Sequence, residues 1–168
     1  RVDATATLTL TNRAPASGLP DVVLSSGDRQ LDGSGPPLGT NRMYFSAYSP
    51  HLLDTATIDG LPLPMGTGEE LGLSVYSAFL SVPPGATVTI VLDLDGEIEP
   101  SEHYQLGVGM QPLVNPDVVG STVRLAEGWT FDPDGAASGY TADGSGGATA
   151  ELVTTEGDQV VGFTAEPD

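Results

Sequence analysis

Apolar and polar residues alternate along most of the chain with a period of two, which is typical of half-buried β-strands. The clearest case is VDATATLTLT at residues 2–11, where every even position is apolar and every odd position is polar. No segment carries a sustained apolar stripe with the 3.6-residue repeat of a helix. We therefore predict an all-β protein of about nine strands, at residues 2–11, 42–49, 55–60, 71–82, 86–95, 102–111, 119–126, 148–154 and 159–165.

The strands before and after Pro83-Pro84-Gly85 are predicted to form a hairpin. Pro84 presets φ for the second position of a type II turn, and Gly85 supplies the positive φ that the third position requires. On the return strand, the alternation predicts a core-facing row made of Ala86, Val88, Ile90, Leu92 and Leu94.

Many short strands, punctuated by 22 glycines and 14 prolines, favour an antiparallel β-sandwich with an immunoglobulin-like architecture. A β-barrel is the alternative. One long loop, residues 13–41, is rich in Gly, Pro and Ser, and only residues 21–26 within it resemble a short strand or turn. We expect a single domain over residues 1–168, with its core in 2–131 and a flexible loop at 132–147. The C-terminal hairpin, 148–165, should join the same sandwich, because an isolated two-stranded hairpin is barely stable.

The charge balance argues against two classes of partner. Asp and Glu total 23 against five arginines, lysine is absent, and the formal net charge is -18. Nucleic acids and anionic lipid surfaces are bound through clustered basic side chains, so we expect no nucleic-acid partner and no direct membrane contact by this domain. Cysteine is also absent, which excludes disulfides, thiolate metal sites and a cysteine nucleophile.

No pattern of reactive residues indicates an enzyme. His51 and His103 are the only histidines. We expect His51 in an exposed turn and His103 at a surface or edge position, and neither has a nearby partner in a recognisable sequence motif. The chain has neither a G-x-S-x-G elbow nor an H-E-x-x-H motif. The acids at 93, 95, 97 and 99 should share one solvent face, but Gly96 occupies position four of an EF-hand loop instead of position six. We therefore assign no catalytic residue, no metal ligand and no cofactor.

The segment NRMYFSAYSP, residues 41–50, contains the candidate ligand-binding residues. Alternation places Met43, Phe45 and Ala47 on one side of the strand. Tyr44, Ser46 and Tyr48 then lie on the other side, where two rings about 7 Å apart could stack on sugar rings. Alternatively, Tyr44 and Tyr48 pack against a neighbouring strand or against the 13–41 loop, or they form the inner face themselves, with their hydroxyls bonded at the sandwich edge. An exposed aromatic row beside a shallow groove would favour carbohydrate binding, and buried tyrosines would favour packing.

Four stretches of the chain resemble a known family. They are NRAPASGLPD (12–21), GTNRMYFSAYSP (39–50), the segment 68–96 and YQLGVGMQPLVNPD (104–117). These stretches are similar to the C-terminal, β-rich region of bacterial, especially actinobacterial, proteins of the domain-of-unknown-function 4012 family. The resemblance spans most of residues 2–131 and is weakest over 132–168. It implies an extracytoplasmic location with a membrane anchor outside this chain, and it supplies no catalytic or binding residues.

Two classes of function remain open. The sequence favours a non-catalytic, extracytoplasmic module of a larger bacterial surface protein, with a structural or protein-interaction role. Its partners would be other domains of the parent protein or other cell-surface proteins. The start at Arg1 without a methionine agrees with an excised piece of such a protein. The alternative is a carbohydrate-binding module that recognises envelope polysaccharide.

Overall fold

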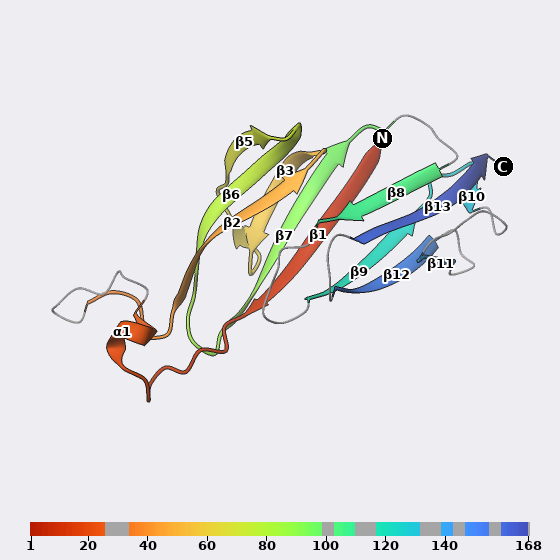
Figure 1. The fold of residues 1–168 in the computed structure, drawn as a ribbon. Coiled ribbons are helices and arrows are strands. Elements are labelled where there is room, and N and C mark those ends of the chain that lie inside the picture. Colours follow the sequence, from red (N-terminus) through yellow and green to blue (C-terminus); the bar gives the residue numbers. More distant parts are fainter. Residues whose placement is uncertain are drawn as a thin grey trace. The chain divides into compact units, whose positions relative to one another are not determined.

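Figure 1 shows the fold of the chain in a computed structural model, which describes residues 1–25, 34–98, 103–109, 117–131, 139–142, 147–154 and 159–167. These residues form thirteen strands and one short helix, α1 (Asp21–Leu24). Every pairing between these strands is antiparallel, which confirms the predicted all-β, antiparallel fold class. The chain divides into two compact units, Arg1–Ile98 and Glu99–Asp168.

The first unit consists of seven strands. They are β1 (Val2–Thr11), β2 (Asn41–Ser49), β3 (Leu52–Ile58), β4 (Leu61–Pro62), β5 (Gly66–Glu70), β6 (Leu73–Val82) and β7 (Thr87–Gly96). One sheet has the order β1-β7-β3-β4, and the other has the order β2-β6-β5 (Figure 1).

The core of this unit lies between its two sheets. Ile90 and Leu92 of β7 contact Ala78 and Leu80 of β6, and all four side chains are buried. Partly buried residues from the remaining strands pack around them, including Ala6, Leu8, Leu10, Met43, Phe45, Ala47, Leu53, Ala56 and Ile58. Burial alternates along β1 as its sequence does, with the even positions half-buried and the odd positions exposed. The unit is therefore a β-sandwich.

The second unit is a smaller sandwich. Its strands are β8 (His103–Val108), β9 (Asp117–Arg124), β10 (Trp129–Phe131), β11 (Thr141–Ala142), β12 (Gly147–Thr154) and β13 (Gln159–Pro167). The sheets have the orders β10-β13-β8 and β11-β12-β9. Both sheets contribute to one core, in which Ala148 and Ala150 of β12 and Val161 of β13 are buried with Tyr140.

The two units share one scheme of strand pairing. In each unit the first strand pairs with the last (β1 with β7, β8 with β13), and the second pairs with the next to last (β2 with β6, β9 with β12). The scheme continues in β3 with β7 and β10 with β13, and in β5 with β6 and β11 with β12. Nested pairing of this kind resembles a jelly roll. In an immunoglobulin constant domain the order is A-B-E-D and G-F-C instead, so the immunoglobulin-like detail of the prediction is not confirmed.

Both predicted hairpins are wrong, because each connects two sheets. β6 and β7 lie in different sheets, and so do β12 and β13. The turn itself is as predicted: Gly85 has φ of 73° and the amide of Ala86 donates to the carbonyl of Pro83. The backbone of the turn also bonds to Asn12, the residue after β1. Gly85 N–H donates to the carbonyl of Asn12, and Asn12 N–H donates to the carbonyl of Ala86. Apolar and polar residues alternate in the same way whether two consecutive strands pair in one sheet or connect two sheets. The local pattern therefore did not distinguish a hairpin from a crossover.

Further differences concern short elements. α1 replaces the strand or turn expected at 21–26, and the two-to-five-residue strands β4, β5, β10 and β11 were not predicted. Within the predicted flexible loop 132–147, Tyr140 is instead buried, and its hydroxyl lies 2.7 Å from that of Ser121. The residues at 132–138 and 143–146 lie outside the described part. The single-domain boundaries 1–168 stay a prediction.

Asn12, directly after β1, joins three separate stretches of chain. Its buried side-chain amide donates to the carbonyl of Gly39 at 2.7 Å and to that of Val82 at 2.8 Å. The Asn12 Oδ1 accepts from the amide of Ala14 at 2.9 Å, in the geometry of an Asx turn. These bonds, the Asn12 network, hold the long loop against the ends of β1 and β6.

We expect Asn12→Ala to lower the free energy of unfolding by about 2–4 kcal/mol, because two buried carbonyls lose their donor. Asn12→Asp should be at least as destabilising at pH 7, where a carboxylate faces two carbonyl oxygens. Its deficit relative to the wild type should shrink at pH 4, because protonation removes the charge and restores one donor. Urea unfolding followed by circular dichroism at both pH values measures these changes. Wild-type stability of Asn12→Ala would contradict the network.

We expect Gly85→Ala to destabilise the protein by about 1–2 kcal/mol, because an L-residue resists positive φ. Gly68→Ala is the matched control: a Cβ at either glycine meets no atom within 4 Å, but only Gly85 has positive φ. The control should be neutral or slightly stabilising. Equal urea midpoints for the two variants would show that the turn conformation is misassigned.

Candidate functional site

The outward side chains of the sheet β2-β6-β5 form an exposed surface that we call the aromatic face. Tyr44, Tyr48 and Phe79 are 63%, 51% and 73% exposed, respectively. Met43, Phe45 and Ala47 pack on the core, so the predicted orientation of β2 is confirmed. The strand register adds the other members of the face: Ser46 from β2, Val75 and Ser77 from β6, and Gly66, Gly68 and Glu70 from β5.

One end of the aromatic face carries a pair of rings. Tyr44 and Phe79 are direct cross-strand neighbours, with ring centroids 4.9 Å apart and planes inclined at 57°. Such a pair contributes about 0.5–1.5 kcal/mol beyond area burial and orients both rings. Both rings nevertheless keep most of their surface in solvent, so they can contact a ligand without rearrangement.

The other end of the face is a tyrosine bonded to a carboxylate. The hydroxyl of Tyr48 donates to Oε2 of Glu70 at 2.7 Å. This hydrogen bond, together with repulsion between the phenolate and the Glu70 charge, raises the pKa of Tyr48 above its usual value. At neutral pH Tyr48 therefore stays a protonated donor, and the bond fixes its ring across the strands.

Small polar residues occupy the centre of the face. Ser46 and Ser77 are opposite one another, with hydroxyl oxygens 2.9 Å apart. Gly66 and Gly68 continue the surface on β5 without side chains. Tyr44 and Tyr48 are four residues apart on one strand, which separates them by about 13 Å. The expected spacing of 7 Å was wrong, because it is the spacing of residues two apart.

The sequence did not reveal Phe79 or Glu70 as members of this face. In β6 the outward row contains Val75 and Phe79, and the inward row contains Tyr76, Ala78 and Leu80, so both rows have apolar residues. Two serines in the outward row, at 77 and 81, were the only signal of its orientation. Glu70 lies on β5, which was not predicted as a strand.

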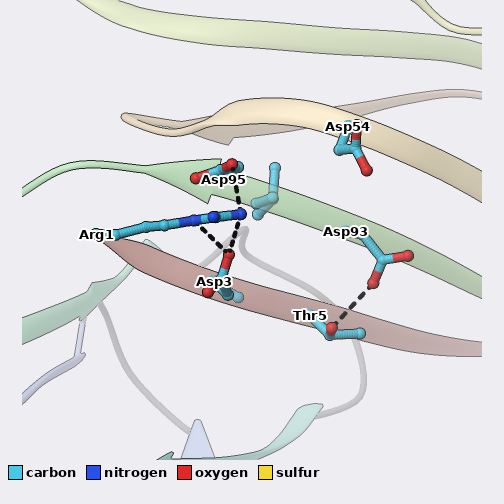
Figure 2. Close-up of a pocket in the computed structure, with 8 residues that line it drawn as sticks. Arg1, Asp3, Thr5, Asp54, Asp93 and Asp95 are labelled. Atoms are coloured by element: carbon cyan, nitrogen blue, oxygen red, sulfur yellow. Dashed lines mark hydrogen bonds and ion pairs between the residues drawn. The ribbon is translucent and has the colours of Figure 1, made fainter. Parts of the chain in front are cut away.

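A second candidate is a shallow acidic hollow of about 200 Å³ on the outer side of the sheet β1-β7-β3-β4 (Figure 2). Arg1 bridges the carboxylates of Asp3 and Asp95 at 3.0 and 3.1 Å. Figure 2 also shows Thr5 beside Asp93 and Asp54 on the neighbouring strand. The register of β3 shifts between Leu53 and Thr55, so Asp54 is the inserted residue of a bulge.

Three of the four acids in the hollow already bond to neighbouring side chains. Asp93 accepts hydrogen bonds from Thr5 at 2.9 Å and from Thr55 at 2.8 Å, and Arg1 pairs with Asp3 and Asp95. Among the described residues, no group of three or more His, Cys, Asp or Glu side chains is arranged to hold a metal ion. The hollow therefore gives no basis for assigning a cation.

The two histidines lie in different units. His51 was expected as an exposed turn residue, but its ring packs directly against Gly96, where a Cβ would overlap it. The carbonyl of His51 accepts from the buried Tyr76 hydroxyl at 3.1 Å, which fixes the turn between β2 and β3. His103 is exposed, with Nδ1 3.3 Å from the hydroxyl of Thr164.

Comparisons with protein-family models, curated proteins and solved structures find no significant match to this chain. The resemblance to the domain-of-unknown-function 4012 family therefore stays a prediction. In the described part of the chain, no helix has the length and apolarity that a membrane span needs.

Proposed function

We propose that this chain is a non-catalytic, extracytoplasmic module of a larger bacterial surface protein, and that its aromatic face binds carbohydrate of the cell envelope. The observation that carries the carbohydrate role is the exposure of Tyr44, Tyr48 and Phe79 on one sheet face. Aromatic rings present flat apolar surfaces that match the C–H face of a sugar ring, and hydroxyls beside them bond its polar edge. The aromatic face offers both chemistries.

The sequence alone favoured a structural or protein-interaction role over carbohydrate binding. The outward orientation of the tyrosines is the reason that we now favour carbohydrate binding. Buried Tyr44 and Tyr48 would have served packing. In the structure Tyr44 contacts Phe79 and Tyr48 bonds to Glu70 on the surface, and more than half of each tyrosine is exposed. The second unit has the same strand scheme, and the exposed side chains described on its strand β9 are not aromatic, which supports a spacer role for that part of the chain.

The proposed location rests on the family resemblance and on the charge. A net charge of -18 with no lysine disfavours nucleic acid and anionic lipid headgroups as partners. A neutral or weakly charged polymer outside the membrane fits this charge better. The membrane anchor of the parent protein would then lie outside the residues present here.

The purified chain should bind at least one polysaccharide from a panel of bacterial envelope glycans, as measured by glycan array and isothermal titration calorimetry. Tyr44→Ala, Phe79→Ala and Tyr48→Ala should each weaken that binding by about 1–2 kcal/mol, because each variant removes a stacking ring. Leu52→Ala is the matched control. Leu52 is an exposed apolar residue of β3, in the other sheet of the same unit, and its loss should leave affinity unchanged.

The ring variants should keep near-wild-type circular dichroism spectra, because the three rings are on the surface. Tyr44→Ala and Phe79→Ala lose the ring pair, so their free energy of unfolding should fall by only about 0.5–1.5 kcal/mol. Absence of binding to every glycan would contradict the carbohydrate role. Binding that survives removal of all three rings would place the site elsewhere on the chain.

Protease added to intact cells that make the full-length protein should remove or release this domain, while a cytoplasmic marker stays intact. Cells stripped of their wall serve as a second sample, because wall layers can block access. The sandwich strands are paired, so cutting should begin in connecting segments. Full protection in wall-free cells, followed by cleavage after lysis, would place the domain in the cytoplasm.

A further inference from the structure

Two charged residues lie at opposite ends of the aromatic face. Arg42 lies on the outer row of β2, two residues before Tyr44, and Glu70 lies beside Tyr48 at the far end. One cation and one anion therefore bracket the rings, with hydroxyls between them. The face has no excess positive charge to attract an acidic polymer, and the chain as a whole carries -18.

We propose that the ligand of the aromatic face is a neutral oligosaccharide, whose chain extends along the strands from the Tyr44–Phe79 ring pair to Tyr48 and whose hydroxyls donate to Glu70. This inference rests on the proposed carbohydrate role and specifies the class of sugar, its length and the residue that selects it.

The length follows from the separation of the rings. Tyr44 and Tyr48 are about 13 Å apart along β2, so a single sugar contacts only one end of the face. Between the ends, Ser46 and Ser77 have no bulk to obstruct a chain, and Gly66 and Gly68 leave the β5 side open, since neither glycine has a side chain. A longer oligosaccharide therefore gains contacts that a short one cannot make.

The selection follows from the acceptor chemistry of Glu70. An ionised carboxylate only accepts hydrogen bonds and has about four acceptor positions, of which the Tyr48 hydroxyl occupies one. Sugar hydroxyls can donate to the remaining positions. The carboxylate of a uronic acid cannot donate at neutral pH, and its charge is repelled by Glu70.

The second unit supplies an internal comparison. The sheet β11-β12-β9 occupies the place of β2-β6-β5 in the shared pairing scheme. The exposed side chains described on β9 are Val118, Thr122 and Arg124, and Thr149 of β12 lies opposite Thr122. None of these described residues is aromatic, so this part of the sheet shows no counterpart of Tyr44, Tyr48 and Phe79.

The test is calorimetry of the full chain with neutral oligosaccharide series, such as glucan, mannan, xylan and galactan fragments of two to six sugars. Polygalacturonate and its carboxyl-reduced neutral form provide a pair matched in linkage. We expect affinity for the recognised neutral series to rise about tenfold or more from disaccharide to hexasaccharide, as contacts reach the second ring. The carboxyl-reduced polymer should bind at least as tightly as polygalacturonate.

Glu70→Gln is the diagnostic variant, because the amide keeps an acceptor for Tyr48 and removes the charge. It should raise affinity for acidic glycans by about twofold to fivefold, as expected for an exposed charge pair. Asp54→Asn, on the other sheet of the unit, is the matched control and should leave both affinities unchanged.

Three results would overturn the inference while leaving the carbohydrate role intact: tighter binding of acidic than of neutral glycans by the wild type, affinity independent of chain length, or no effect of Glu70→Gln on acidic glycans. Failure of every glycan, neutral or acidic, would instead remove the carbohydrate role itself. Saturable binding of a protein partner to the face in that case would restore the interaction role that the sequence favoured.

Discussion

The side-chain amide of Asn12 holds the base of the first sandwich at the point where β1, the long loop and the end of β6 meet. Its two hydrogen bonds reach Gly39, just before β2, and Val82, the last residue of β6. These bonds hold the start of β2 and the end of β6 beside the end of β1. A slip of one residue would turn every outward side chain of a strand inward, because strand side chains alternate with a period of two. The Asn12 amide therefore supports the register in which Tyr44 and Phe79 face outward, together with the core residues on the inward rows of β2 and β6.

The two units show that one pairing scheme can support different surfaces. Both place their first strand against their last and their second against the next to last. In the first unit the second strand presents Tyr44 and Tyr48 to solvent, whereas the equivalent strand of the second unit presents Thr122. The fold alone therefore does not imply binding, which depends on the side chains placed on its outer rows.

The aromatic face and the acidic hollow differ in what a ligand could gain from them. In the hollow, Arg1 and two threonines already bond to Asp3, Asp93 and Asp95, and an exposed ion pair changes little in free energy when it is exchanged for another. In the aromatic face, the rings keep more than half of their surface in water. Covering that apolar area is favourable by about 25 cal/mol per Å². The aromatic face is the better binding surface for this reason.

The sequence by itself determined the long strands, the inward rows of β1 and β7 and the turn at Gly85, because alternation and positive φ are local properties. The alternating burial of β1 followed from it directly, whereas the sequence left open whether Tyr44 and Tyr48 are exposed or packed. Only the tertiary structure decided which strands pair. The consecutive strands that were predicted to form hairpins lie in different sheets, and Asn12, Phe79 and Glu70 make their contacts with residues distant in sequence. An alternating pattern states which side of a strand faces the core, but it does not state which strand lies beside it, because that choice depends on contacts across the whole sandwich.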